Sequence, residues 1–260
     1  MDRFKHFKAE AIIFDKDGTL IDFDAMWGGW TVHLAGQLQQ ASGIDVHKAL
    51  YNSMGYDEVT KKILANGKLA ATPMAQLYKL TVEVLQTSGL SSEKAEHVVA
   101  QTWCIPDPIL LAKPFTVTRS LFARLQSKGI KIAIATADDR TPTQAMIEAF
   151  DIDEYITTMV CADDGIPSKP APDMVLTICE RMQLHPSKVM VIGDTISDLK
   201  MARSAGAGLA VGVLSGVSSA DDLAAHADLI LESVDELHLY VQGFGDQPNP
   251  HKGLNPDFAF

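Results

Sequence analysis

The sequence predicts a doubly wound α/β fold, in which helices cover both faces of a parallel sheet, with further helices inserted after the first strand. Apolar runs rich in Val, Ile and Ala recur along the chain and are nearly continuous, as in strands buried on both faces. Helical spacing separates the later runs, for example at Val117, Leu121 and Leu125 and again within 174–182. Strands that alternate with helices are typical of a doubly wound sheet.

Five apolar runs are predicted strands, and a weaker sixth follows them. In chain order they are Ala11–Phe14, Lys131–Thr136, Thr157–Ala162, Val189–Gly193, Gly208–Val213 and Asp228–Leu231. Each run ends in polar or glycine residues, where ligands gather in sheets of this kind.

The interval from Asp24 to Asp107 contains no convincing strand. Its segments are helix-like and are separated by glycine-containing breaks; they are Met26–Ala41, Asp57–Ala65, Pro73–Thr87 and Ser91–Trp103. We therefore predict a core formed by 1–22 and 109–242, a helical domain at 23–108, and an extended or mobile tail at 243–260.

Composition narrows the classes of function. The chain has 260 residues, a hydrophobic content of 47% and a formal net charge of −11, which disfavours binding to nucleic acid. No apolar stretch approaches the ~20 residues of a membrane span, and the first predicted strand leaves no room for a signal peptide. Three cysteines, at 104, 161 and 179, lack metal-ligand spacing. We expect a cytoplasmic protein that is a monomer or homodimer.

The most informative feature is the pair Asp15 and Asp17, which directly follows the first predicted strand. Alternate residues of an extended strand share a face, so both carboxylates are expected to project together. Two such groups repel each other unless a cation or proton compensates, which suits a divalent metal and acid/base chemistry. A plain turn is the alternative. A calcium loop is excluded because its twelfth position is Met26.

Polar residues also follow three later strands. Thr136 and Ala137 offer a hydroxyl and backbone amides to a phosphoryl oxygen, although a threonine there also caps helices. Lys169 lies between two prolines near a predicted helix start, which indicates an anionic neighbour unless it is a surface lysine. Asp194 and Asp198 are one helical turn apart and suit Mg²⁺, although Asp194 also suits a helix N-cap.

These four motifs, in this order and each at a strand end, resemble those of the haloacid dehalogenase-like hydrolase superfamily, which implies a Rossmann-like core. The resemblance implies that Asp15 is the nucleophile and that Asp17 is the general acid and base. It also implies that Thr136 and Lys169 hold the phosphoryl group, and Thr19 and Ala137 are assigned to phosphate binding.

The resemblance further implies a Mg²⁺ site. Its expected ligands are Asp15, the backbone carbonyl of Asp17, Asp194 and, directly or through a neighbour, Asp198. An acid at position 17 favours phosphate esters, because a leaving alkoxide needs a proton donor.

The position of the insert resembles the phosphoglycolate phosphatase and β-phosphoglucomutase branch, which has a helical cap. On this resemblance, Trp27 and Tyr56 are candidate substrate-binding residues, although Trp27 also suits the cap core. We predict a Mg²⁺-dependent phosphatase that acts on a small phosphorylated metabolite, phosphoglycolate-like or a sugar phosphate. The alternatives are a phosphomutase, which the lack of an arginine between residues 20 and 110 disfavours, and a non-catalytic regulatory protein that binds a metal or phosphometabolite.

Overall fold

The computed structural model describes residues 7–64, 67–72, 74–104 and 118–239. Its centre is a six-stranded sheet in the order β5-β4-β1-β6-β7-β8, with every neighbouring pair parallel. The strands are β1 (Ala11–Phe14), β4 (Lys131–Ala135), β5 (Ile156–Val160), β6 (Val189–Gly193), β7 (Leu209–Val213) and β8 (Leu229–Leu231). The predicted parallel α/β fold is therefore confirmed.

The topology changes direction at β1. From β1 the chain builds outward through β4 and β5, then returns to the other side of β1 and continues through β6, β7 and β8. Ligands of open α/β sheets bind beyond the carboxyl ends of the strands at such a switch point. The residues that follow β1, β4 and β6 therefore meet at the most favourable position for a site.

Helices cover both faces of the sheet. One face packs against α8 (Thr118–Ser127), α9 (Arg140–Ala149) and the 3₁₀ helix η5 (Val234–Leu239). The other packs against α10 (Asp173–Met182), α11 (Ile196–Ser204) and α12 (Ala220–Ala224). Side chains of β1 alternate between the two layers, with Ile12 and Phe14 in one and Ala11 and Ile13 in the other. Short 3₁₀ turns complete the connections at η2 (Asp153–Tyr155), η3 (Ala162–Asp164) and η4 (Pro186–Lys188).

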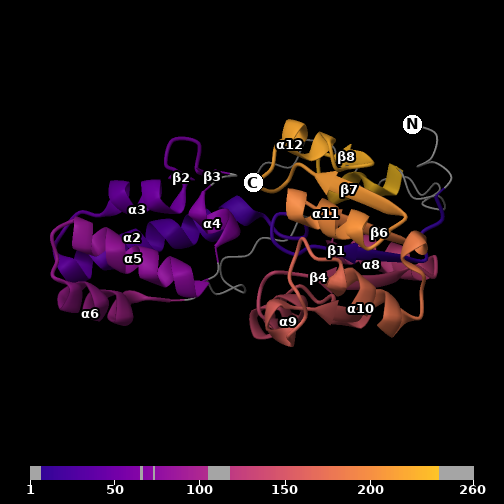
Figure 1. Cartoon of the computed structure of the whole chain (residues 1–260), viewed down its shortest axis with the longest axis horizontal. Coiled ribbons are helices and arrows are strands. Elements are labelled where there is room, and N and C mark those ends of the chain that lie inside the picture. Colours follow the sequence, from indigo (N-terminus) through magenta and orange to yellow (C-terminus); the bar gives the residue numbers. More distant parts are fainter. Residues whose placement is uncertain (1–6, 65–66, 73, 105–117, 240–260) are drawn as a thin grey trace, which may run out of the picture.

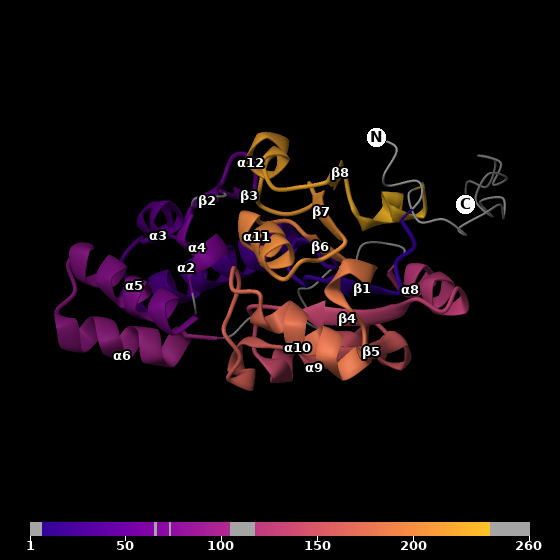
Figure 2. The ribbon, with the colours of Figure 1, turned by 45° about the vertical axis from the view of Figure 1, so that its right-hand side comes forward.

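The chain between β1 and α8 forms a separate group of helices to one side of the sheet, at the left of Figure 1 and again in the turned view of Figure 2. They are the π-helical turn η1 (Asp24–Gly28), α2 (Gly29–Ser42), α3 (His47–Met54), α4 (Lys68–Ala71), α5 (Met74–Thr87) and α6 (Ser92–Thr102). We call these elements, together with the short hairpin at Tyr56–Ile63 that is described below, the helical region.

The helical region has its own buried cluster, which includes Trp30, Leu34 and Leu85 and does not merge with the two clusters at the sheet. The division into domains remains a prediction. The boundaries at 109 and 242 and the tail at 243–260 lie outside the described residues. Within the described ranges, no helix is both long and apolar enough to span a membrane.

The predicted helix at Asp57–Ala65 is wrong. This segment starts with a short antiparallel hairpin, β2 (Tyr56–Asp57) and β3 (Lys62–Ile63). The physical reason is local: Asp57 Oδ1 accepts a hydrogen bond from the Val59 amide at 2.9 Å, and Oδ2 accepts one from the Thr60 hydroxyl at 2.8 Å. Aspartate side chains that bond to the backbone two residues ahead favour turns over helices. The helix α3 was not predicted.

Candidate active site

Three carboxylates gather beyond the carboxyl ends of β1 and β6. Asp15 directly follows β1, Asp194 directly follows β6, and Asp198 lies in the first turn of α11. One oxygen from each lies within 4.8 Å of the others. The three residues are at most 8% exposed. Since β1 and β6 are parallel neighbours, their ends place these acids at the same edge.

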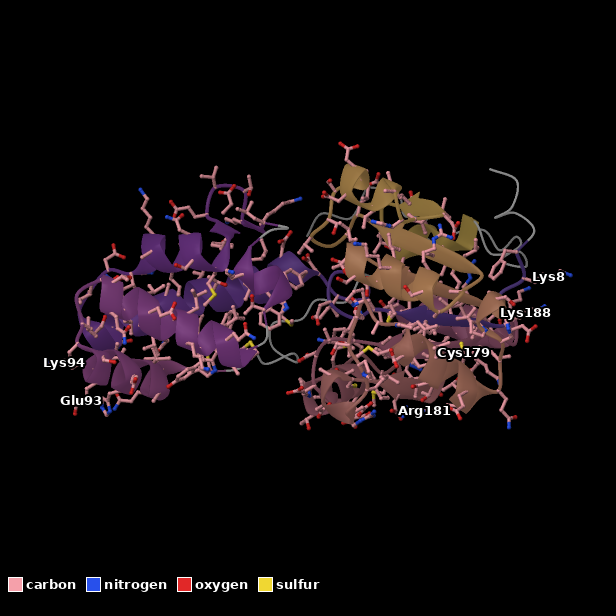
Figure 3. The ribbon with its side chains drawn as sticks, viewed as in Figure 1. Lys8, Glu93, Lys94, Cys179, Arg181 and Lys188 are labelled. Atoms are coloured by element: carbon pink, nitrogen blue, oxygen red, sulfur yellow. The ribbon has the colours of Figure 1, made fainter. Side chains whose placement is uncertain are left out.

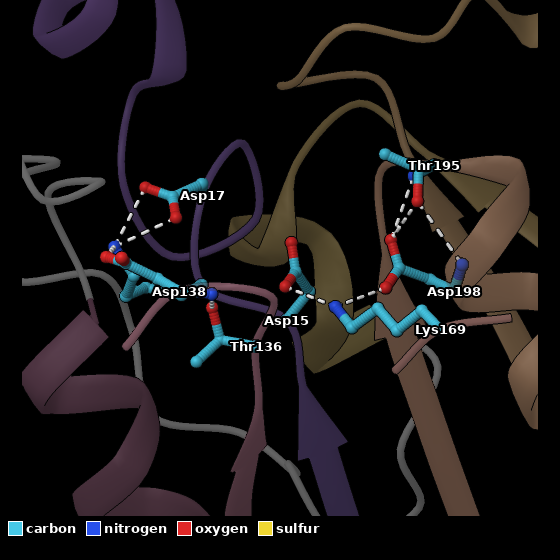
Figure 4. Close-up of polar contacts among 8 residues, drawn as sticks. Asp15, Asp17, Thr136, Asp138, Lys169, Thr195 and Asp198 are labelled. Atoms are coloured by element: carbon cyan, nitrogen blue, oxygen red, sulfur yellow. Dashed lines mark hydrogen bonds and ion pairs between the residues drawn. The ribbon is translucent and has the colours of Figure 1, made fainter. Parts of the chain in front are cut away.

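Lys169 compensates part of this negative charge. Its Nζ lies 2.5 Å from Asp15 Oδ1 and 2.5 Å from Asp198 Oδ1, and its side chain is only 7% exposed (Figure 4). The anionic neighbour expected from the sequence is therefore present, and the alternative of a surface lysine is wrong. Three carboxylates and one ammonium group leave a formal excess of two negative charges.

The electrostatics of the carboxylates fit a divalent cation. Burial raises the pKa of Asp15 to about 7, against the opposing effect of Lys169. Burial, together with the charges of Asp15 and Asp198, also raises the pKa of Asp194 well above its usual range. Within the described residues, Asp194 Oδ1 is buried and has no hydrogen-bond partner. Oxygen ligands with excess negative charge are what Mg²⁺ prefers, so the residues present fit this ion.

The loop after β7 positions Asp194. The amide of Val217 donates a hydrogen bond to Asp194 Oδ2 at 2.9 Å. A Cβ atom on Gly216 would overlap the same carboxylate, and Gly18, with φ +83°, would bring a Cβ to 2.6 Å from Asp194 Oδ2. Sequence reasoning did not find Gly216 or Val217. The only available signal was that they follow a predicted strand.

Thr195, rather than Asp194, is the N-cap of α11. Its hydroxyl accepts from the Asp198 amide at 3.2 Å, while Asp198 Oδ2 accepts from the Thr195 amide at 3.1 Å. This reciprocal arrangement is a capping box. It fixes Asp198 through one oxygen and leaves the other toward Lys169. The alternative reading of Asp194 as the cap is therefore wrong.

Asp17 lies apart from the three clustered carboxylates, and the buried Lys16 holds it. Lys16 Nζ is 2.8 Å from Asp17 Oδ2 and 2.9 Å from Asp138 Oδ2, and its side chain is 1% exposed. Asp15 and Asp17 line the same cleft, as their expected joint projection implies, but Asp17 is not one of the three clustered carboxylates. The extended strand ends at Phe14, so its two-residue alternation does not continue through the turn. Sequence reasoning missed Lys16 and Asp138 as site residues.

Thr136 does not cap the next helix, because the N-cap of α9 is Asp139. Thr136 Oγ1 accepts a hydrogen bond from the Asp138 amide at 3.1 Å, which shapes the turn. Thr136 and Ala137 also line the cleft that contains the carboxylates. Thr19 is fully buried in the turn after β1, and its hydroxyl has no partner within the described residues.

The two predicted substrate-binding aromatic residues lie in different surroundings. Trp27 lines the cleft and packs on Phe23, with ring centroids 6.0 Å apart. Tyr56 packs against Tyr51 at 5.0 Å within the hydrophobic cluster of the helical region. Tyr56 is not among the described residues that line the cleft.

The cleft has a volume of about 560 Å³ and lies between the sheet edge and the helical region. The sheet edge contributes Asp15, Asp17, Asp138, Lys169, Asp194 and Asp198, among others. The segment between β1 and α6 contributes Phe23, Trp27, Leu69, Thr72, Met74 and Leu77. One wall is therefore charged and the other largely apolar.

Comparison with known proteins identifies relatives of this chain. The family model described as haloacid dehalogenase-like hydrolase matches residues 9–206, which include Asp15, Lys169, Asp194 and Asp198. Phosphoglycolate phosphatase from Escherichia coli is 33% identical over 116 residues, which are 44% of this chain and 45% of that protein. The chain therefore matches less than half the length of this relative.

Two further similarities span more of the chain. N-acetylmuramic acid 6-phosphate phosphatase from Pseudomonas aeruginosa is 25% identical over 235 residues, 90% of this chain and 95% of that protein. The crystal structure of a HAD hydrolase of family IA, variant 3, from Entamoeba histolytica has a TM-score of 0.61 at 23% identity. It covers 87% of this chain and 94% of that chain. This last similarity shows a shared fold.

Proposed function

Because the chain belongs to the haloacid dehalogenase-like hydrolase family, we propose that it is a Mg²⁺-dependent phosphatase that hydrolyses a small phosphorylated metabolite. The observation that carries the proposal is the buried Asp15, paired with Lys169 and adjacent to Asp194 and Asp198 at the sheet edge. The two phosphatase relatives support the reaction type.

The first half-reaction transfers the phosphoryl group to Asp15. A carboxylate oxygen of Asp15 forms a bond to phosphorus while the ester P–O bond breaks. The leaving oxygen takes a proton from Asp17, which also lines the cleft. Lys16 Nζ donates a hydrogen bond to Asp17 Oδ1 at 3.0 Å, which orients the carboxyl group for this transfer. Lys169 and the turn at Thr136 hold the phosphoryl oxygens, because phosphoryl transfer depends chiefly on positioning and charge neutralisation.

The second half-reaction restores the enzyme. Asp17, now a carboxylate, accepts a proton from water, and the water oxygen bonds to phosphorus as the Asp15 O–P bond breaks. Inorganic phosphate and a protonated Asp17 result. The ammonium group of Lys169 is a constant positive charge beside Asp15 throughout, since the same two neighbours that bind it raise its pKa against the effect of burial.

Asp15, Asp194 and Asp198 would hold the Mg²⁺ ion, together with the backbone carbonyl of Asp17. The bound ion supplies the positive charge that offsets these carboxylates and the phosphoryl oxygens. The unpartnered oxygen of Asp194 and the raised pKa of this group support its role as a ligand.

The proposal also includes a cytoplasmic location, which the three free cysteines Cys104, Cys161 and Cys179 support. A monomer or a homodimer is compatible with it, and size-exclusion chromatography with light scattering distinguishes the two.

The test measures phosphate released from a panel of phosphomonoesters, with and without Mg²⁺. We expect phosphate and alcohol in equal amounts, only with Mg²⁺, and a loss of roughly 10³-fold or more in Asp15→Asn. Glu93→Gln is the matched control, because Glu93 is exposed on α6 at the far end of the helical region (Figure 3). It should retain full activity.

The alternatives predict different products. A phosphomutase would return an isomeric phosphate ester and little inorganic phosphate. A non-catalytic binding protein would bind Mg²⁺ and release nothing from any ester in either form. Either result with correctly folded protein would contradict the proposed phosphatase.

A further inference from the structure

The wall of the cleft that faces the carboxylates is apolar. Phe23, Trp27, Leu69, Met74 and Leu77 line it from the helical region. Val217, whose amide holds Asp194, continues the apolar surface from the loop after β7. A phosphomonoester with its phosphoryl group at Asp15 would place its alcohol part in the remainder of this cleft.

The charges in the cleft are strongly one-sided. Its lining includes six carboxylates, from Asp15, Asp17, Asp138, Asp194, Asp198 and Asp222. Among the described residues of the lining, Lys169 is the single cation, and Asp15 and Asp198 already hold its Nζ. The ammonium group of the adjacent Lys16 is likewise held, by Asp17 and Asp138.

A second anionic group on the substrate would meet no free cation among the described residues of the lining. The phosphoryl group uses Lys169 and the metal charge, and the rest of the described lining is apolar, acidic or uncharged and polar, the last being Thr72, Thr136, Thr195, Ser197 and Ser218. Burial of an ionised carboxylate without a cation is unfavourable even where hydroxyl groups are near, so such a substrate is disfavoured. An uncharged ring or alkyl chain instead gains from contact with the apolar wall, and sugar and aromatic rings suit the faces of Trp27 and Phe23.

We propose that the substrate is the phosphate monoester of an uncharged alcohol, and that the apolar wall formed by Phe23, Trp27, Leu69, Met74 and Leu77 rejects esters with a second anionic group. The inference rests on the proposed phosphatase activity and narrows its substrate. It also separates this chain from the two relatives, since phosphoglycolate and N-acetylmuramic acid 6-phosphate each carry a carboxylate.

The test compares two matched pairs of substrates with the 260-residue chain and Mg²⁺. Ethyl phosphate is paired with 2-phosphoglycolate, and N-acetylglucosamine 6-phosphate with N-acetylmuramic acid 6-phosphate. We expect kcat/KM to be at least tenfold higher for the uncharged member of each pair, about one decade per 1.4 kcal/mol of discrimination. An equal or reversed preference would overturn the inference and leave the phosphatase activity standing.

A variant tests whether the wall is responsible. Met74→Lys places a cation at the start of α5 in the cleft lining. We expect Met74→Lys to reduce the ratio of kcat/KM between the uncharged and the anionic substrate of each pair at least fivefold. Met74→Gln introduces a polar but uncharged side chain and should leave this ratio unchanged. Thermal unfolding checks that both variants fold. Equal effects of the two substitutions, or no effect of the lysine, would refute the assignment to this wall. If no phosphomonoester is hydrolysed at all, the proposed function fails and the inference fails with it.

Discussion

The two walls of the cleft are built by opposite means. At the sheet edge, the charged side chains are fixed by hydrogen bonds and ion pairs, as Asp198 is by Thr195 and Lys169. On the helical side, apolar residues belong to or adjoin a hydrophobic cluster and make few directed contacts. Directed, desolvated charges fix the position of reacting groups, whereas apolar surface is tolerant of shape. Under the proposed function, the sheet edge would perform the chemistry and the helical region would select the substrate.

The largest effect is expected where the charged wall loses its cation. Lys169→Met removes the ammonium group from Asp15 and Asp198, so we expect the free energy of unfolding without metal to fall by about 3–5 kcal/mol. Urea denaturation measures this loss, and Mg²⁺ should restore part of it. Lys188→Met is the control, because the Lys188 side chain is 55% exposed, its Nζ lies 3.4 Å from Glu10 Oε1, and it is at the opposite end of the molecule from the helical region (Figure 3). Similar losses in both variants would show that the buried ion pairs of Lys169 contribute no more to stability than the exposed pair of Lys188.

The second prediction concerns the helical region. Leu85 is fully buried in the cluster of this region and does not line the cleft. Leu85→Ala should lower the free energy of unfolding by about 2–5 kcal/mol through the cavity it leaves, with phosphate release per folded molecule nearly unchanged. Leu64→Ala, at a position 48% exposed, is the control. If Leu85→Ala lost as much turnover as Asp15→Asn, the proposed division of roles between the two walls would be contradicted. Two separate unfolding transitions would support the predicted domains.

A third prediction tests the position of Asp17. Lys16→Met removes its ion pair, so we expect kcat for an alkyl phosphate to fall by about 10²-fold. The fall should be smaller for 4-nitrophenyl phosphate, whose leaving group needs little protonation. Lys16→Arg should recover part of the activity, and Lys94→Met on the exposed side of α6 should have no effect. Equal losses for both esters would contradict a role in proton transfer.

The smallest expected effect is the contribution of Asp15 to the pH dependence of the free energy of unfolding. Burial raises the pKa of Asp15 to about 7, above the ~4 of an unfolded chain. The folded state therefore binds this proton more tightly, and its stability falls as pH rises between about 4 and 7. Without metal, we expect the wild type to lose on the order of 2 kcal/mol more than Asp15→Asn between pH 5 and pH 8.

Urea titrations of both proteins at the two pH values measure this difference. Saturating Mg²⁺ should reduce it, because a bound cation favours the ionised carboxylate. Identical pH dependence of the two proteins would show that Asp15 ionises as it does in the unfolded chain.

The sheet was predictable because its signals are local. Continuous apolar runs identified β1, β4, β5, β6, β7 and β8 to within about two residues. The helical region was less predictable: the hairpin at Tyr56–Ile63 was taken for part of a helix, because one side chain, Asp57, decided the turn. The family resemblance drawn from the four motifs is confirmed by the match over residues 9–206.

The sequence by itself determined that Asp15, Lys169, Asp194 and Asp198 would belong to one site. Residues that follow parallel strands must meet at one edge of the sheet, whatever the loops do. The roles of these residues remain part of the proposal, and the order of the strands, with β1 between β4 and β6, came from the structure.

Only the tertiary structure decided how the remaining residues meet. Lys16 joins Asp17 to Asp138 across more than a hundred residues, and the Val217 amide reaches Asp194 from another loop. Side-chain directions in turns follow no period, so no spacing in the sequence foretells these contacts. The apolar wall could not be predicted either, because the spacing of its residues is also that of an ordinary helix core. The sequence does not determine which of these apolar residues face the carboxylates. The packing of the helical region against the sheet edge determines it.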